Sequence, residues 1–201
     1  AILFESGIYA VLPKDMPETL ALAALDVAGA PAQVAKLARP CQSVVILGSA
    51  GKSGMLCAYE AVKRVGPTGT VIGLVRNEKE AALLARVSDK IKVVIADATK
   101  PIEVLNAVLA ANDGKEVDIA INCVNVQNTE MSTILPVKDL GIAYFFSMAT
   151  SFTKAALGAE GVGKDVTMIV GNGYTKDHAA ITLEELRESA VLREIFNELY
   201  V

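Results

Sequence analysis

The chain has 201 residues, 52% of them hydrophobic, and a formal net charge of −4. This length supports one sizeable core but is short for two full domains. The acidic balance disfavours nucleic acid as a partner, and because no apolar run reaches the roughly 20 residues that cross a bilayer, we expect no membrane partner either. Three scattered cysteines without C-x-x-C spacing are typical of reduced thiols in a cytoplasmic protein, and the single histidine disfavours a metal site.

The first forty residues precede the regular part of the sequence. Residues 1–17 are predicted to be strand and loop because two prolines interrupt them. A helix is predicted from Glu18 to Ala28, ended by the segment Gly29-Ala30-Pro31, and a short second helix from Ala32 to Ala38.

From residue 43 onward, short apolar strands alternate with helices. Strands are predicted at Ser43–Leu47, Thr70–Val75, Lys92–Ala96, Val117–Val124, Ala143–Ser147 and Val166–Val170. Helices are predicted at Ser53–Val65, Glu78–Val87, Ile102–Asn112, near Thr129–Leu135, at Leu183–Leu199 and, as helix or loop, at Thr153–Ala159. The strands are continuous apolar runs, which indicates that both faces of a parallel sheet are covered. We therefore predict an α/β, doubly wound Rossmann fold with six parallel strands in the order 3-2-1-4-5-6 and helices on both faces.

A glycine-rich turn joins the first of these strands to its helix. It reads Gly48-Ser49-Ala50-Gly51-Lys52-Ser53-Gly54, with glycine at every third position. A helix N-terminus at the end of a strand collects unpaired N–H groups and the positive end of the helix dipole, so we predict that residues 48–54 bind a pyrophosphate. A P-loop is excluded because that pattern requires glycine where Ile46 stands.

The next two strand ends are predicted to hold the adenosine half of a dinucleotide, since ligands bind at the carboxyl ends of such strands. Arg76 and Asn77 follow the second strand, where NAD-binding proteins usually carry a carboxylate. Arg76 makes NADP an alternative to NAD, because its guanidinium suits a ribose phosphate. Asp97 and Ala98 follow the third strand and are placed near the adenine, although Asp97 has the alternative of capping the next helix through Thr99.

The fourth and fifth strand ends are predicted to flank the nicotinamide half. The residues concerned are Asn122, Cys123, Val124 and Asn125, and then Ser147, Met148 and Ala149. Cys123 has apolar neighbours in sequence, which favours an inert thiol over a nucleophile. His178 is a candidate general base and Glu130 a candidate substrate contact, but a capping or surface role suits both equally well or better. The catalytic acid and base therefore stay unknown.

The sixth strand is predicted to form an edge of the sheet. It is apolar from Val166 to Val170, and exposed apolar edges pair readily with another strand. We therefore expect a two-fold homodimer joined along this strand.

Several segments extend these motifs into a resemblance to a known family. They are Leu25–Val34, Gly48–Gly54, Ile121–Asn125, Thr129–Met131, Tyr144–Phe152 and Ala156–Asp165, followed by the loop from Gly171 to Tyr174. Together they cover most of the chain, and it resembles the L-erythro-3,5-diaminohexanoate dehydrogenases of lysine fermentation, which are themselves similar to medium-chain dehydrogenases.

The resemblance implies NAD-linked oxidative deamination of a small diamino acid, giving 5-amino-3-oxohexanoate, ammonia and NADH. It also implies that residues 1–40 connect to an N-terminal GroES-like catalytic domain and that residues 41–201 form the dinucleotide-binding domain. Three alternatives remain open from the sequence: a medium-chain NADPH-dependent carbonyl or quinone reductase, a nucleotide-sensing domain without catalysis, and a scaffold that binds no nucleotide.

Overall fold

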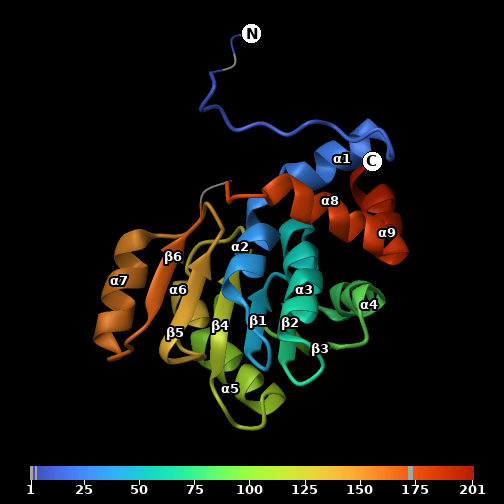
Figure 1. Cartoon of the computed structure of the whole chain (residues 1–201). Coiled ribbons are helices and arrows are strands. Elements are labelled where there is room, and N and C mark those ends of the chain that lie inside the picture. Colours follow the sequence, from blue (N-terminus) through green and yellow to red (C-terminus); the bar gives the residue numbers. More distant parts are fainter. Residues whose placement is uncertain (1, 3, 172–173) are drawn as a thin grey trace.

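A computed structural model describes residues 2, 4–171 and 174–201, and its centre is one parallel sheet. The strands are β1 Ser43–Leu47, β2 Thr70–Val75, β3 Ile91–Ile95, β4 Val117–Asn122, β5 Val137–Phe145 and β6 Thr167–Val170. They lie in the order β3-β2-β1-β4-β5-β6, and every neighbouring pair is parallel (Figure 1). This confirms the predicted doubly wound fold and its strand order.

Helices cover both faces of the sheet. They are α1 Glu18–Leu25, α2 Gly29–Leu37, α3 Lys52–Val65, α4 Glu78–Val87, α5 Pro101–Ala111, α6 Glu130–Ile134, α7 Phe152–Gly161, α8 His178–Glu188 and α9 Ala190–Tyr200. The first four and last two contribute side chains to the core on one face, and α5, α6 and α7 to the clusters on the other. No single helix among the described residues is long and apolar enough to cross a membrane, and the apolar pair α1 and α2, bent by 56° at its break, contributes to the core.

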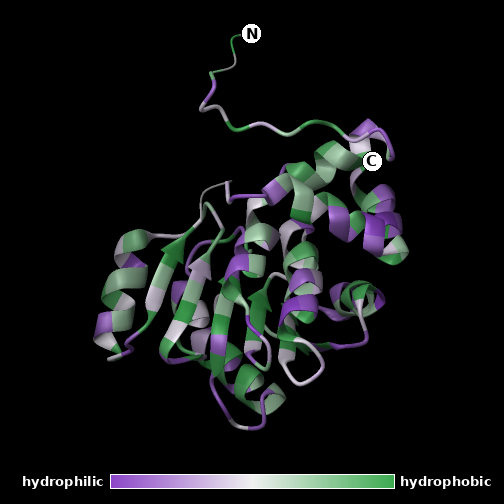
Figure 2. Cartoon of the chain, in the orientation of Figure 1, coloured by the Kyte–Doolittle hydropathy of each residue, from purple (hydrophilic) through white to green (hydrophobic). Residues whose placement is uncertain are grey.

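Alternate residues of each central strand enter opposite cores. Val44 and Ile46 of β1 pack with the α2 and α3 side, whereas Val45 and Leu47 pack with the α5 side. All four are fully buried, which explains why the strand reads as an uninterrupted apolar run. Figure 2 shows the same pattern as a concentration of hydrophobic colour on the sheet.

The segment before residue 41 is an integral part of this core. Leu20, Ala24 and Val34 are fully buried in the same cluster as the β1 side chains. The predicted helix boundaries here were wrong, because α1 ends at Leu25 and α2 already begins at Gly29. Pro31 therefore lies in the first turn of α2, where its missing N–H removes no helical hydrogen bond.

The predicted single C-terminal helix is two helices. Helix α8 starts at His178 and ends at Glu188, and α9 starts at Ala190. Ser189 between them has extended dihedrals, and its Oγ accepts a hydrogen bond of 3.1 Å from the Leu192 N–H. A serine side chain that caps a helix competes with continuation of the helix before it, which accounts for the break.

Strand β5 is longer than predicted. It begins at Val137 and not at Ala143, and a register irregularity interrupts its pairing with β4 between Val117 and Ile119. The added residues include exposed charges, so their sequence does not read as a buried strand. The other predicted strands and helices from residue 43 to residue 170 agree with the structure to within two residues at each end.

Two glutamates are buried between α3 and α8. Glu60 is fully buried and bonded to Arg64 Nε at 2.7 Å, with Lys63 Nζ at 3.3 Å. Glu185 is also fully buried, and within the described part of the chain neither of its carboxylate oxygens has a hydrogen-bond partner. Burial, and next the charge of Glu60, raise the pKa of Glu185 well above its usual value.

We predict that Glu185→Gln stabilises the fold near pH 7 by about 1–3 kcal/mol, because it removes an unpaired buried carboxylate. The raised pKa of Glu185 means that its carboxyl supports folding below the unfolded pKa of about 4.3, and that this support is lost as the pH rises through the folded-state pKa. Urea denaturation should therefore show a gain that grows from pH 4 to pH 7.

The matched control is Glu184→Gln, one residue earlier on the same helix, where the side chain is 53% exposed and pairs with Arg187. This variant should change the free energy of unfolding by less than about 0.5 kcal/mol. A Glu185→Gln effect that is the same at pH 4 and pH 7 would contradict the account.

Candidate dinucleotide site

The glycine turn after β1 is held by its own backbone. The N–H groups of Gly48 and Ser49 both donate to the Leu74 carbonyl, at 3.0 and 3.1 Å. The Gly51 N–H donates to the Gly48 carbonyl at 3.1 Å. These amides shape the turn, so the expectation that the whole bend offers its N–H groups to a ligand was too broad.

Free donors lie instead at the start of α3. No acceptor within the described residues pairs with the N–H groups of Lys52, Ser53 and Gly54, and no side chain caps this helix. Helix N-termini that lack a cap expose donors at the positive end of the helix dipole. An anion bound here would complete the first turn of α3.

The three glycines of the turn have different structural roles. Gly48 has φ +79°, a conformation that favours glycine. A Cβ on Gly54 would lie 2.1 Å from the Gly48 carbonyl oxygen, so the contact between helix and turn requires glycine. A Cβ on Gly51 would lie 3.4 Å from that oxygen, which is an ordinary contact. The fold therefore needs Gly48 and Gly54, whereas Gly51 leaves the approach to the helix terminus open.

A cavity of about 510 Å³ opens beside this turn, at the carboxyl ends of β1, β2, β3 and β4. Its lining contains many of the predicted site residues, namely Gly48, Ala50, Gly51, Arg76, Asp97, Ala98, Cys123, Val124 and Asn125. The fold thus brings together residues from four separate strand ends, as the topology predicts.

The other predicted site residues at the first two strand ends lie outside the lining and make protein contacts. Ser49 is fully buried and donates from Oγ to the Ile46 carbonyl at 2.6 Å. Lys52 Nζ forms an ion pair with Asp26 at 3.1 Å, and Ser53 and Gly54 belong to the first turn of α3. Asn77 caps α4, because its Oδ1 accepts from the Glu80 N–H at 3.0 Å.

Four residues that were predicted to flank the nicotinamide lie outside the cavity lining, namely Asn122, Ser147, Met148 and Ala149. Asn122 is fully buried and donates to Thr129 Oγ1 and Thr133 Oγ1, at 2.8 and 3.0 Å. Its Oδ1 accepts from the Val124 N–H at 2.9 Å, so it ties the loop after β4 to α6. Among the residues after β5, Ser147 Oγ accepts from the Ala149 N–H, and Met148 is 91% exposed.

Glu80 is a site residue that the sequence analysis missed. It lines the cavity, and its carboxylate binds the Arg76 guanidinium, with Nε at 2.8 Å, as well as the Arg76 N–H at 3.0 Å. Burial raises the pKa of Glu80, but the hydrogen bonds and charge of Arg76 outweigh it and bring that pKa below its usual value. The spacing of four residues between Arg76 and Glu80 was the available signal.

The alternative in which Asp97 caps the next helix is wrong, because α5 begins after Lys100 and has no side-chain cap; Asp97 instead closes the turn before that helix. Its Oδ1 accepts from the N–H and the hydroxyl of Thr99, at 2.9 and 2.7 Å. These hydrogen bonds hold the pKa of Asp97 below its usual range. Because Asp97 and Thr99 both line the cavity, the turn after β3 also forms part of its wall.

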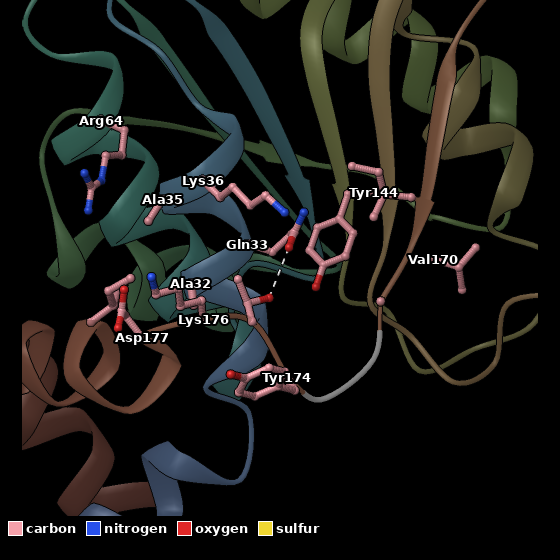
Figure 3. Close-up of a pocket in the computed structure, with 14 residues that line it drawn as sticks. Ala32, Gln33, Ala35, Lys36, Arg64, Tyr144, Val170, Tyr174, Lys176 and Asp177 are labelled. Atoms are coloured by element: carbon pink, nitrogen blue, oxygen red, sulfur yellow. Dashed lines mark hydrogen bonds between the residues drawn. The ribbon is translucent and has the colours of Figure 1, made fainter. Parts of the chain in front are cut away.

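A second cavity, of about 730 Å³, lies between α2, the ends of β5 and β6 and the segment that leads into α8 (Figure 3). Lys36, Lys176 and Arg64, the last paired with Glu60, line it together with Asp177. Thr175 Oγ1 donates to Gln33 Oε1 at 3.1 Å. This cavity was not predicted from the sequence, because its residues come from separate segments that only the tertiary fold brings together. Two residues of the adjoining loop, 172 and 173, lie outside the described residues.

His178 and Glu130 line neither of these two cavities. His178 is the first residue of α8, and its ring lies edge-on to Tyr174 with the ring centroids 5.2 Å apart. Glu130 is buried at the start of α6, and its carboxylate accepts a hydrogen bond of 2.7 Å from the Ser151 N–H. This bond joins the loop before α7 to α6.

Two known proteins are similar in sequence to the whole of this chain. No family model matches the sequence. The chain is 87% identical over 201 residues to an L-erythro-3,5-diaminohexanoate dehydrogenase of Fusobacterium nucleatum and 70% identical over the same length to one of Acetoanaerobium sticklandii. Along its whole length the chain resembles part of the diaminohexanoate dehydrogenases. This confirms the resemblance predicted from the sequence segments; the chain spans 58% of the length of each of these relatives.

Solved structures with much lower identity share the fold. The alcohol dehydrogenase of Aeropyrum pernix is 20% identical, with a TM-score of 0.66 over 94% of this chain and 56% of that chain. Mycobacterial Rv1454c, solved as a complex with NADPH, is 17% identical, with a TM-score of 0.62 over 96% of this chain and 57% of that chain. At this identity the likeness shows a common Rossmann-type architecture.

The different roles of Gly54 and Gly51 predict that replacement by alanine lowers the stability of the protein at the first position and not at the second. Gly54→Ala should destabilise the protein by about 1–3 kcal/mol, because the added methyl group meets the Gly48 carbonyl and α3 has to shift. Gly51→Ala, the matched control in the same turn, should change the free energy of unfolding by less than about 0.5 kcal/mol. Urea denaturation measures both, and equal losses for the two variants would contradict these roles.

Proposed function

We propose that this chain is the dinucleotide-binding part of an NAD(P)-dependent amine dehydrogenase that acts on L-erythro-3,5-diaminohexanoate. The observation that carries the proposal is the 87% identity, over all 201 residues, to a protein of that name. The cavity at the carboxyl ends of β1 to β4 supports it, because dinucleotides bind at this place in doubly wound folds.

The cavity and the adjoining N-terminus of α3, whose residues 52–54 lie just outside the lining, suit a dinucleotide. In the proposed arrangement the free N–H groups of Lys52, Ser53 and Gly54 bind the pyrophosphate, where the helix dipole favours negative charge. Arg76 and Glu80 lie at the ribose end, and the turn containing Asp97 borders the adenine. The loop from Cys123 to Asn125 then faces the nicotinamide.

The pair formed by Arg76 and Glu80 favours NAD over NADP in this proposal. The Arg76 charge is balanced by Glu80, so a ribose phosphate would have to compete with an existing ion pair. Glu80 supplies the carboxylate that usually accepts from the ribose hydroxyls, from a position four residues after Arg76.

The chemistry of the proposed reaction belongs to the cofactor. A bound nicotinamide would supply the acceptor for a hydride from the carbon that carries the 3-amino group, and hydrolysis of the resulting substrate imine would release ammonia. The chain's residues hold the cofactor against the substrate and shape a cavity that limits water.

We also propose a cytoplasmic location, in keeping with the free thiols of Cys41, Cys57 and Cys123.

A further part of this proposal is that residues 1–40, whose helices α1 and α2 pack in the core of this domain, connect it to a GroES-like catalytic domain. The relatives are longer than this chain, which spans 58% of their length. In the extended segment before α1, apolar side chains such as Phe4, Tyr9 and Val11 are 63–80% exposed, and such side chains favour contact with another apolar surface.

We propose that the second cavity, through Lys36 and Lys176, binds the carboxylate of the substrate at the boundary with such a domain.

We expect the full-length protein to reduce NAD in the presence of 3,5-diaminohexanoate and not with simple alcohols. NAD should be preferred over NADP, and Gly51→Ala should raise the KM for NAD about tenfold at unchanged stability, because its methyl group obstructs the approach to the helix terminus. Steady-state absorbance at the NADH band gives these constants.

Other results would redirect the proposal. Reduction of carbonyls or quinones by NADPH, without diamine activity, would indicate a reductase. Binding of NADH without any turnover would indicate a nucleotide-sensing domain. Calorimetry that detects neither NADH nor NADPH binding would overturn the dinucleotide site itself.

We further propose a homodimer formed along β6. This strand is an outer strand of the sheet, and Val170 at its end is 41% exposed. An unpaired edge offers backbone N–H and C=O groups to a second copy, and a two-fold axis would continue the sheet across both chains.

The proposed dimer predicts that a single substitution on β6 abolishes dimerisation. Val170→Lys should convert the protein to a monomer, because lysine on an edge strand opposes pairing. Light scattering at micromolar concentration measures the mass, and Leu157→Lys on the exposed face of neighbouring α7 is the control, with no expected change. A monomeric unaltered protein would refute the dimer.

A further inference from the structure

Two of the cysteines meet beside the dinucleotide cavity. Cys57 lies in the second turn of α3 and is fully buried. Cys123 directly follows β4 and lines the cavity of about 510 Å³. Their Sγ atoms are 4.0 Å apart, although the residues are 66 positions apart in the sequence. The third cysteine, Cys41, is exposed and contacts Thr68 Oγ1 at 3.0 Å.

The distance suits a reversible bond between the two sulfurs. A disulfide has an S–S length of about 2.05 Å, so the sulfurs need to approach by roughly 2 Å, which side-chain rotation and a small backbone shift can supply. The two thiols differ in access, because Cys123 borders the cavity whereas Cys57 lies behind it in the core. Burial raises the pKa of the Cys57 thiol, which further favours Cys123 as the first to react.

We propose that Cys57 and Cys123 form an oxidative modification site, that a peroxide converts the pair to a disulfide, and that a bound dinucleotide shields the pair. The shielding rests on the proposed dinucleotide site, whereas formation of the disulfide depends only on the two thiols. The ligand class of this site is a small peroxide, for which hydrogen peroxide is the probe.

The reaction has two balanced steps. The Cys123 thiolate attacks one oxygen of hydrogen peroxide, the O–O bond breaks, and the products are a sulfenic acid and hydroxide, which takes up the thiol proton as water. The Cys57 sulfur then attacks the Cys123 sulfur, the S–O bond breaks, and a second water leaves with the Cys57 proton. In total, two thiols and one peroxide give one disulfide and two waters, and the two electrons lost by sulfur reduce the peroxide.

The disulfide would act on the dinucleotide site through the glycine turn. The chain at Cys123 and Val124 packs directly on Gly48, since a Cβ built there would lie 3.1 Å from Val124 Cγ2. A bond from Cys123 to α3 therefore fixes two walls of the cavity relative to each other and displaces the segment that touches the turn. The oxidised protein should bind NADH about tenfold more weakly, and reduction should restore its affinity.

The test uses the full chain with Cys41→Ser, so that the exposed thiol does not interfere. After treatment with hydrogen peroxide, tryptic digestion and mass spectrometry should detect a linked pair of peptides containing Cys57 and Cys123, which dithiothreitol separates. Saturating NADH should slow formation of the linked pair about tenfold. Cys57→Ser in the same background is the matched control and should give Cys123 sulfenic acid without the linked pair.

Three results would overturn the inference. One is that no linked peptides form at any peroxide concentration that leaves the protein folded. Another is that the linked pair forms at the same rate with and without saturating NADH, and the third is that the oxidised and reduced proteins bind NADH equally well. A wrong proposed function would give a different result. The reduced chain would then bind no NADH by calorimetry, whether or not the linked peptides form.

Discussion

The contact between Gly54 and the Gly48 carbonyl determines the geometry of the whole site. Because no side chain separates them, α3 begins directly against the turn that follows β1. The turn is closed by two N–H groups that donate to the Leu74 carbonyl of β2, so the neighbouring strand also takes part. The unpaired donors of the first helical turn are thereby held at the carboxyl edge of the sheet, which is where an anionic ligand gains most from the helix dipole.

The walls around this point are kept in place by polar side chains that bond to the protein itself. Asn122 joins the loop after β4 to α6, and Asp97 closes the turn after β3. Such residues were expected to touch the cofactor, yet most of their hydrogen bonds are made to the protein. A strand end that lines a cavity needs rigid loops, and the polar groups nearest to the ligand are often the ones that supply this rigidity.

The strand order and the glycine turn could be predicted from the sequence because each depends on local patterns. Continuous apolar runs identify buried parallel strands, and glycine at every third position marks a strand-to-helix turn. The errors occurred where a local signal has two meanings. Pro31 ends a helix in one context and starts one in another, and Ser189 reads as an ordinary helical residue until its side chain caps α9.

The sequence by itself determined the fold class, the place of the turn and the strand ends that meet there, because these follow from periodicity and from chain connectivity. Only the tertiary structure decided which side chains face the cavity, that Glu80 holds Arg76, and that Cys57 lies 4.0 Å from Cys123. The physical reason is that rotamers, hydrogen-bond partners and contacts across many residues are set by packing, and packing depends on segments that lie far apart in the sequence.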